Sequence, residues 1–454
     1  MIFTSEIFIL FAIIFFPAYF MMPTARAQNI LALVASWVFY GWWDWRFLGL
    51  IGASTLVNFA LASTAKRAKR WLWLAITCNL GLLGVFKYFG FFTAEFAQLL
   101  AGLGVNTDLP ILTLLLPVGI SFFTFQALSY VIDVARGTLP PERDLIRFAT
   151  YIALWPQLVA GPIVRAQQLL PQLARHQPFR WPNVWLGAEM IVIGAVLKLV
   201  VADRLAPLVD RVFAQPDLFS QSALLTGVVF FAFQIYADFA GYSLMAIGFG
   251  RLMGLRFPVN FRRPYLARNF SEFWRRWHIS LSGWLRDYLY IPLGGNRVRP
   301  GRNLMATMVL GGLWHGAAWP FVIWGGLHGG YLIIAQRLFW PKMGKWPARL
   351  CVFLAVCFAW IFFRADSFGQ ATLLLSGLIG SGTNGGMGLP QLEVAIGASV
   401  IAILTVVEIL REDSRFAQSV MRARSWRLLS GVALILSLPL LGQFDGGAFV
   451  YFQF

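Results

Sequence analysis

The sequence predicts an all-α protein that crosses the membrane many times, and three observations carry this prediction. The 454 residues are 58% hydrophobic and only 13% charged, whereas a soluble domain carries about 25% charged residues. The mean hydropathy is +0.67. Apolar runs close to the roughly 17 to 25 residues that cross a bilayer as a helix recur along the chain. No polar segment is long enough for a soluble domain, so residues 1–454 are predicted to form one integral-membrane domain.

Eleven apolar runs are the predicted membrane spans. They are 6–23, 28–45, 47–65, 71–92, 111–132, 183–202, 222–250, 320–340, 349–364, 391–410 and 428–443. The first is predicted to be an uncleaved span, because Glu6 stands where a signal peptide carries basic residues. Two further runs, 148–164 and 304–318, are shorter and interrupted by Gly or Pro. They predict re-entrant half-spans, which are tolerated only when buried in protein or lining a cavity.

The net charge of +17 reflects membrane topology rather than nucleic-acid binding. The basic residues lie in short loops between the apolar runs, as the positive-inside rule requires of cytoplasmic loops. Two such loops are marked by Lys66, Arg67, Lys69 and Arg70 and by Arg337, Lys342, Lys345 and Arg349. Loop 93–110 contains no Lys or Arg and is predicted to lie outside. This places the amino terminus outside as well.

The largest weakly apolar region is 251–302, which we expect at the cytoplasmic face. It holds eleven arginines and no lysine, against Glu272 and Asp287 as its only acidic residues. A generic topogenic loop would mix both basic residues. Arginine alone indicates bidentate recognition of phosphate or carboxylate groups.

Within this region, Asn269 to Leu289 is predicted to form one amphipathic helix. Asn269 and Glu272 have the spacing of a capping box, and aromatic and leucine side chains recur on one face. Such a helix lies in the membrane interface. Two interpretations stay open: an anchoring helix with an incidental His278, or a floor element that presents His278 to a central cavity.

His315 is the leading candidate for chemistry. It lies within the apolar segment 311–319, where a titratable group is costly and is a functional-site hypothesis by default. Imidazole exchanges protons near neutral pH. The nearby glycines (Gly311, Gly312 and Gly316) permit close backbone approach, and Trp314 and Trp319 could wall a pocket. The alternative is a core histidine bonded to a backbone carbonyl.

Other polar residues in apolar runs have less specific interpretations. Asp238 needs a partner, either an arginine of the following loop or a histidine, and could support the site. Lys87 and Lys198 lie near predicted span ends and are expected to snorkel. His328 is predicted to pack structurally, and His176 to be solvated. The three cysteines lack metal-site spacing, so no metal site is predicted.

Several longer segments resemble the membrane-bound O-acyltransferase family, and most of all its bacterial alginate O-acetyltransferase branch. They are Phe273–Ser282, Trp284–Tyr288, the Tyr290–Asn296 turn, Gly312–Gly316, Trp324–Gly329, Leu116–Phe122, Ala160–Ile163 and the closing Phe449–Phe454. The resemblance covers nearly the whole chain in order. It implies a ring of about 11–12 tilted transmembrane helices, with re-entrant segments and interfacial helices around a thinned centre.

The resemblance also implies an activity and its residues. His315 is then the catalytic histidine and His278 the second functional one. His315 would act as a base toward an acceptor hydroxyl or carry acetyl transiently. Trp314 and Asp238, singled out above from their positions in apolar runs, are the candidates to support the site. The expected donor substrate is cytoplasmic acetyl-coenzyme A, with no permanently bound cofactor. Arg275, Arg276 and Arg286 are candidates for contacts to that donor.

The same resemblance implies a place and partners for the reaction. Acetyl would pass through the bacterial inner membrane to a periplasmic serine-hydrolase-like partner that acetylates an exported polysaccharide. The polymer stays open between alginate, acetylated cellulose, another exopolysaccharide and peptidoglycan, and D-alanyl transfer to teichoic acid is a more distant alternative. A transporter of an acyl carrier and a non-catalytic subunit of a polysaccharide complex are the alternative functions.

Overall fold

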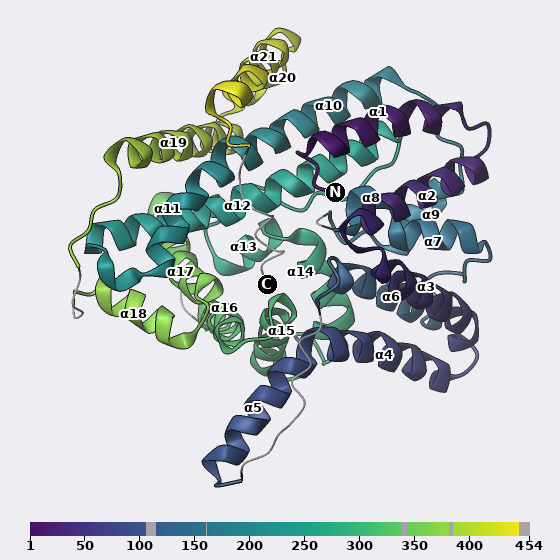
Figure 1. Cartoon of the computed structure of the whole chain (residues 1–454), viewed down its shortest axis with the longest axis horizontal. Coiled ribbons are helices and arrows are strands. Elements are labelled where there is room, and N and C mark those ends of the chain that lie inside the picture. The colour runs from purple at the N-terminus through teal and green to yellow at the C-terminus, as the bar shows by residue number, and fades with distance from the viewer. Residues whose placement is uncertain (106–114, 160, 338–342, 381–384, 445–454) are drawn as a thin grey trace. The chain divides into compact units, whose positions relative to one another are not determined.

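The computed structural model describes residues 1–105, 115–159, 161–337, 343–380 and 385–444, and their regular secondary structure is helical (Figure 1). Within the described residues the sole β feature is an isolated bridge between Phe219 and Met387. The all-α prediction is confirmed. Parts of several predicted features lie outside the described residues: Ala160, Lys342, the end of loop 93–110, residues 111–114 and the closing Phe449–Phe454 segment.

The chain divides into two compact units. The first consists of residues 1–188 and 246–258, and the second of residues 189–245 and 259–454. The first unit contains α1 (Glu6–Met21), α2 (Ala25–Asp44), α3 (Arg46–Ala65), α4 (Lys69–Leu83), the π-helical turn η1 (Gly84–Tyr88), α5 (Phe89–Gly102), α6 (Ile120–Ala135), α7 (Leu145–Ala153), α8 (Trp155–Leu158) and α9 (Ala166–Leu173). Helices α10 (Trp181–Ala195) and α12 (Gln221–Leu252) carry the chain from one unit into the other.

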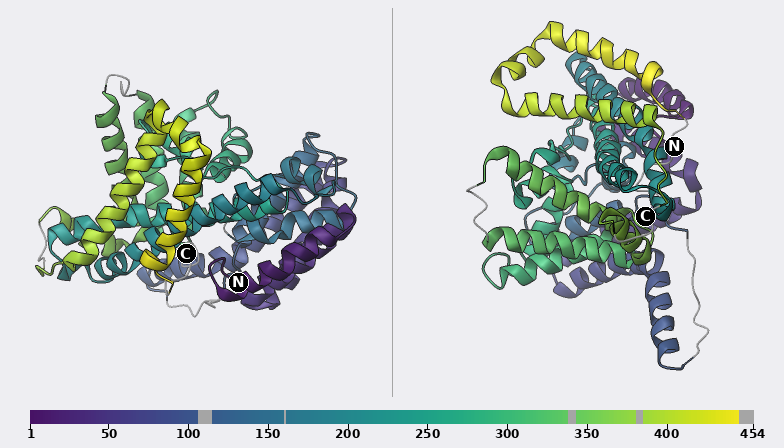
Figure 2. Two further views of the ribbon diagram at one scale, coloured as in Figure 1. Left: turned by 90° about the horizontal axis from the view of Figure 1, so that it is seen from above. Right: turned by 90° about the vertical axis from the view of Figure 1, so that its left-hand side faces the viewer.

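The second unit contains the remaining helices. They are η2 (Val196–Ala202), α11 (Asp203–Ala214), η3 (Pro216–Leu218), η4 (Pro264–Leu266), α13 (Phe270–Arg276), α14 (Ile279–Leu285), η5 (Arg286–Tyr290), α15 (Pro300–His315), α16 (Trp319–Arg337), α17 (Lys345–Arg364), α18 (Phe368–Leu378), α19 (Gln391–Asp413), α20 (Arg415–Arg422) and α21 (Arg424–Leu441). In Figure 2 the yellow helices α20 and α21 turn back from α19.

Aromatic packing organises the first unit. Trp155 is fully buried. Its ring contacts phenylalanine rings from the amino terminus, α1 and α2. The centroid of Phe8 on α1 lies 5.5 Å away and that of Phe39 on α2 lies 5.8 Å away. Polar contacts join other helices: the amides of Asn58 on α3 and Asn79 on α4 donate to one another. Such side-chain amide pairs hold helices together where water is absent.

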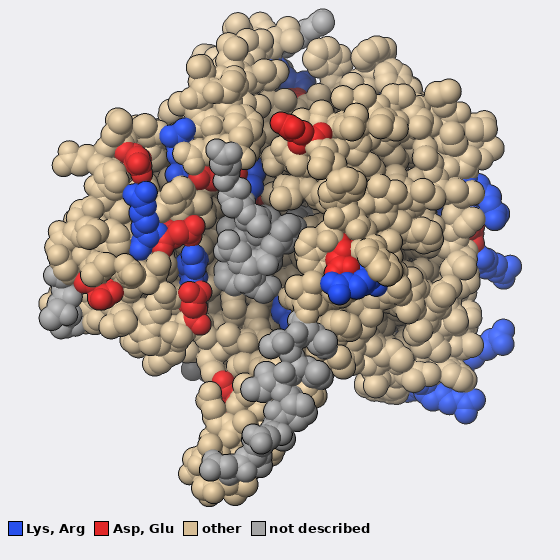
Figure 3. Space-filling model, viewed as in Figure 1, with Lys and Arg blue, Asp and Glu red and all other residues tan. Residues whose placement is uncertain are grey.

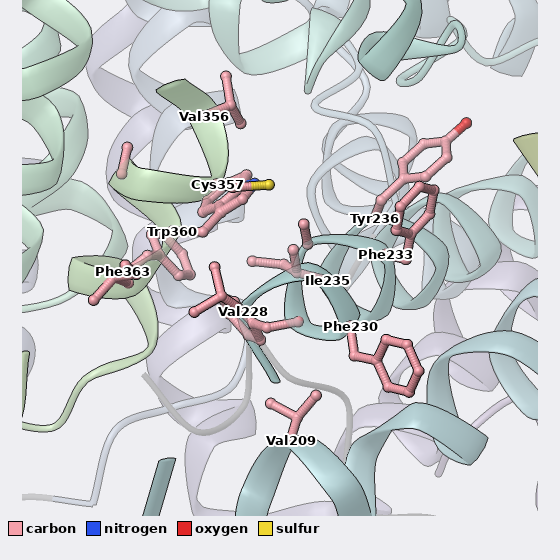
Figure 4. Close-up of a cluster of buried hydrophobic side chains, with 14 of the residues drawn as sticks. Val209, Val228, Phe230, Phe233, Ile235, Tyr236, Val356, Cys357, Trp360 and Phe363 are labelled. Atoms are coloured by element: carbon pink, nitrogen blue, oxygen red, sulfur yellow. The ribbon is translucent and has the colours of Figure 1, made fainter. Parts of the chain in front are cut away.

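The core of the second unit lies between α11, α12, α16 and α17. Figure 4 shows Trp360 and Cys357 of α17 facing Ile235 and Val228 of α12. Two glycines bring α10 and α12 together, because a Cβ on Gly194 would lie 2.6 Å from the carbonyl oxygen of Gly241. A larger residue at either position would separate these helices.

Six helices of the described part are long and apolar enough to cross a membrane, or seven if the bent pair α20–α21 is one span. They are Arg46–Ala65, Lys69–Gly102, Trp181–Ala214, Gln221–Leu252, Lys345–Arg364 and Gln391–Asp413. The polytopic prediction is therefore confirmed. Within the described residues, the predicted spans 6–23 and 320–340 correspond to the shorter apolar helices α1 and α16.

Both predicted half-spans form interrupted or short helices. Run 148–164 contains α7 and α8, which are separated at Leu154, just before Pro156. Run 304–318 begins in α15, which ends at His315, and the 16 residues of that helix extend only about 24 Å against a hydrocarbon thickness of about 30 Å. Most of the face shown in Figure 3 is uncharged, and its charged side chains lie mainly in a mixed group on the left and along the right edge.

Candidate active site

His278 lies at a break between two short helices rather than on one continuous helix. The prediction of a single helix from Asn269 to Leu289 is wrong: α13 ends at Arg276, His278 adopts a left-handed conformation with φ 42°, and α14 begins at Ile279. Only the predicted start is confirmed, since the Asn269 side chain accepts a hydrogen bond from the Glu272 N–H at 2.8 Å. A non-glycine residue in this conformation costs about 1–3 kcal/mol, so surrounding contacts must stabilise it.

Asn260 supplies those contacts. Its backbone oxygen accepts from Ile279 N–H at 2.9 Å, and its Oδ1 accepts from the Ser280 N–H at 3.2 Å and from the Ser280 hydroxyl at 2.9 Å. Its Nδ2 donates to Ser243 Oγ at 2.9 Å. Asn260 therefore holds the start of α14, although nothing in the sequence distinguishes it from its loop neighbours.

The same asparagine sets the tautomer of His278. Nδ1 of His278 lies 3.2 Å from Asn260 Oδ1, and that oxygen is the acceptor because a backbone N–H already donates to it. Nδ1 therefore carries the proton and Nε2 is the basic nitrogen. Complete burial lowers the pKa of His278 well below its ordinary value, so the imidazole is neutral.

We expect replacement of Asn260 by Asp to shift the pH dependence of activity. A carboxylate beside Nδ1 stabilises the imidazolium and raises the pKa of His278. The basic form is then lost at higher pH, so the acidic limb of the rate profile moves upward. Asn260→Ala should lower the rate about tenfold or more by freeing the imidazole. Ser282→Ala is the control, since the Ser282 hydroxyl donates to the Trp277 carbonyl instead. An unchanged profile in Asn260→Asp would contradict this role.

His315 forms the last residue of α15 and lies beside His278. The two imidazole centroids are 6.4 Å apart, and His315 is 4% exposed. Three aromatic rings surround it, with centroids of Trp314, Trp324 and Phe363 at 5.0, 5.2 and 5.3 Å. The two predicted functional histidines, far apart in sequence, are thus brought together in an enclosed aromatic setting.

The glycines around His315 allow α15 and α16 to pack backbone to backbone. A Cβ on Gly312 would overlap the carbonyl oxygen of Phe321, and one on Gly316 would overlap the Phe321 ring. The predicted close approach is confirmed. Trp319, however, does not enclose the histidine, because it is 52% exposed at the start of α16. Trp324, about one and a half turns further along the helix, takes that position.

We expect Gly312→Ala to destabilise the protein by about 1–3 kcal/mol, the usual cost of overpacking a tight contact. The added methyl group must displace the α16 backbone, which cannot move as a side chain can. Gly326→Ala is the matched control, because a Cβ there meets nothing within 4 Å. Thermal unfolding in detergent compares the two. Equal stability of both variants would show that the α15–α16 contact is looser than described.

Asp238 finds a partner other than the expected arginine or histidine. Its Oδ1 lies 2.8 Å from Nζ of Lys198 on η2, and the same ammonium lies 2.7 Å from Asp203 Oδ1. The prediction that Lys198 snorkels is wrong as well, since its side chain is 4% exposed. The close contact of Gly194 with Gly241 brings the two helices near enough for this ion pair. Asp238 therefore ties α12 to η2.

The three candidate arginines differ in their surroundings. Arg276 is held by Glu272 at 2.6 Å and Glu412 at 2.7 Å, which anchors α13 to the end of α19. Burial would raise the pKa of Glu272, but hydrogen bonds from Arg268 and Arg276 hold it below its ordinary value. Arg286 is 66% exposed and pairs with its neighbour Asp287. Arg275 is exposed.

These differences predict opposite behaviour for two neighbouring arginines. Arg276→Gln should destabilise the protein by about 1–3 kcal/mol, because two partly buried carboxylates each lose one of their cationic partners. Arg275→Gln should leave stability unchanged and raise KM for an anionic donor. Thermal unfolding and initial rates measured on both variants separate the two roles. A raised KM in Arg276→Gln at unchanged stability would reverse the assignment.

Comparison with known proteins decides the family. Residues 38–372, which include both histidines, match the sequence model of the membrane-bound O-acyltransferase family. The chain belongs to this family. It is therefore a membrane acyltransferase, as the resemblance of its motifs implied.

Relatives of this acyltransferase cover most of its length. It is 42% identical over 396 residues to the Azotobacter vinelandii protein named probable alginate O-acetylase AlgI, covering 84% of this chain and 79% of the relative. It is 36% identical to a peptidoglycan O-acetyltransferase of Helicobacter pylori, over 84% of this chain and 80% of that one. A teichoic acid D-alanyltransferase of Streptococcus thermophilus is 32% identical over 48% of this chain and 56% of its own.

Proposed function

We propose that this acyltransferase takes acetyl groups from cytoplasmic acetyl-coenzyme A and supplies them for O-acetylation of an exported polysaccharide of the alginate type. The observation that carries the proposal is the buried pair of His278 and His315, with 6.4 Å between ring centroids. The names of the relatives, an alginate O-acetylase and a peptidoglycan O-acetyltransferase, support a polysaccharide acceptor.

In the proposed reaction His315 is the general base. Its imidazole takes the proton from an acceptor hydroxyl, and the oxygen forms a bond to the thioester carbonyl carbon. The C–S bond then breaks, and the proton passes to the leaving thiolate. The surrounding rings of Trp314, Trp324 and Phe363 keep water from the thioester. His278, with Nε2 as its basic nitrogen, orients or assists from the adjacent position.

The donor's phosphates would be held at the Arg-rich face. Arg275 and Arg286 are exposed and suited to bidentate contacts, whereas Arg276 is engaged with two glutamates. Coenzyme A is a substrate in this proposal, so no cofactor is held permanently. The chain would act in the bacterial inner membrane, with a periplasmic serine-hydrolase-like partner completing transfer to the polymer.

The release of free thiol from acetyl-coenzyme A tests this function. Purified protein is reconstituted in vesicles together with its partner, and radiolabelled acetyl donor is added on one side. We expect thiol release that requires donor at the Arg-rich face, with label appearing in polysaccharide. His176→Ala serves as a control, because His176 is exposed and bonds to Met22 in the first unit. Donor binding without thiol release would support a transporter instead.

A further inference from the structure

A third histidine, His328, lies in the same core as the two already described. It is fully buried on α16, with ring centroids of Trp324 at 4.8 Å and Trp274 at 5.1 Å. The Trp324 ring also contacts His315, at 5.2 Å. His328 is therefore one aromatic ring away from the proposed base. The proposed reaction gives it no role.

The polar atoms of this cluster are unusual for a packed core. Among the described residues, neither ring nitrogen of His328 has a hydrogen-bond partner, and the same holds for the indole N–H groups of Trp274 and Trp324. The two indoles also contact one another, with centroids 5.8 Å apart. Buried polar groups are nearly always satisfied, because burying them without a partner is costly. Three neighbouring side chains whose buried polar atoms lack a hydrogen-bond partner indicate a shared ligand.

The chemistry of the three groups specifies that ligand. Each indole supplies one donor, and a neutral imidazole supplies one donor and one acceptor. A carbonyl oxygen could accept from the donors but would leave the imidazole acceptor unsatisfied. A hydroxyl oxygen can accept from two N–H groups and donate its own proton to the imidazole nitrogen. A hydroxyl therefore pairs three of the four polar groups, both indole N–H groups and the imidazole acceptor, whereas a carbonyl pairs only two.

We propose that His328, Trp274 and Trp324 form a buried site for one hydroxyl group, of a water molecule or of an alcohol. The site is separate from the His278–His315 pair and is linked to it through Trp324. In the first case it holds a structural water in the core. In the second it binds the acceptor's hydroxyl one ring away from His315, which would rest on the proposed function. The competing explanation is plain packing, in which N–H groups point at ring faces.

Four histidines in the whole chain make a direct measurement practicable. Protein labelled with ¹⁵N-histidine is placed in lipid vesicles, and solid-state NMR reports which ring nitrogens accept hydrogen bonds. His328→Phe assigns the His328 signals, and His176→Gln, at an exposed position, is the control. Trp274→Phe removes one indole donor and keeps an aromatic ring. It therefore tests the site even if His328→Phe does not fold.

The spectra report on hydrogen bonding at the site without requiring any catalytic turnover. We expect the unprotonated nitrogen of His328 to show a hydrogen-bonded shift that moves in Trp274→Phe. Polarisation transfer from water protons identifies a water, and a shift that appears only with added acceptor oligosaccharide identifies an alcohol. A nitrogen at the non-bonded position in every sample would overturn the proposal and support plain packing. None of these spectra depends on acyl transfer. A failure of the proposed acyltransferase function can therefore be told apart from a failure of the hydroxyl site.

Activity gives a second readout. If the hydroxyl belongs to the acceptor, His328→Phe should lower polysaccharide acetylation about tenfold, the effect of one lost hydrogen bond in the transition state. His328→Gln, which keeps a donor and an acceptor, should retain most of it. If the hydroxyl belongs to water, both variants should lose thermal stability, and His328→Phe should lose more than His328→Gln. Equal activity and equal stability of Phe, Gln and His at this position would contradict the site.

Discussion

Replacement of His315 by Ala should abolish acetylation of the polysaccharide while the protein still accumulates in the membrane. A positioned general base contributes about 10²- to 10⁴-fold to a rate, and no other described side chain occupies the place of His315 between Trp314, Trp324 and Phe363. The measurement is the acetyl content of exported polymer, normalised to the amount of membrane protein.

The matched control for this variant is His176→Ala, which removes an exposed imidazole from the other unit. We expect it to acetylate at the normal level. Retained acetylation by His315→Ala at normal protein level would remove His315 from the chemistry. It would leave the alternative of a subunit that supports the complex without catalysing transfer.

Replacement of Lys198 by Met should destabilise the protein by about 3–5 kcal/mol, the cost of leaving buried charges without their partner. The Lys198 ammonium neutralises Asp203 and Asp238 at 2.7 and 2.8 Å, and all three side chains are at most 6% exposed. Without it, two carboxylates face one another away from water. The measurement is thermal unfolding in detergent, together with the amount of folded protein in the membrane.

Two companion variants identify the cause of that loss. Asp203→Asn leaves one lysine and one carboxylate, so it should cost much less than Lys198→Met. The triple variant, which combines Lys198→Met with Asp203→Asn and Asp238→Asn, removes every charge and should recover part of the stability. If Lys198→Met proved as stable as the unmodified chain, the ion pair would not be holding η2 against α12.

The sequence predicted the helical membrane fold and the family, because these depend on local composition and on contiguous motifs. The roles of His278 and His315 stay a prediction. The glycines at 312 and 316 were also readable, since close backbone approach requires glycine whatever the partner helix. The sequence did not reveal which charged side chains pair with one another across helices. Lys198 looked like a span-end lysine, although η2 lies inside a continuous 34-residue helix, and Asp238 looked like a residue awaiting an arginine.

The helix break at His278 was hidden for a similar reason. The capping pattern at Asn269 and the aromatic spacing are compatible with a continuous helix. Only the hydrogen bonds that Asn260 accepts from Ile279 and Ser280 show why α14 starts anew. Arg276 was indistinguishable from Arg275 in sequence, because its partner Glu412 lies far along the chain. Interactions of this kind depend on tertiary packing rather than on local pattern.

The central claim is that His278 and His315 act as one catalytic unit, and a double-mutant cycle tests it most directly. Thiol release from acetyl-coenzyme A is measured for His278→Ala, His315→Ala and the double variant at equal amounts of folded protein. Groups that act together show losses that do not add. We predict that the double variant is about as slow as His315→Ala alone. Losses that multiply in the double variant would contradict a shared site and show that the two histidines, 6.4 Å apart between ring centroids, work independently.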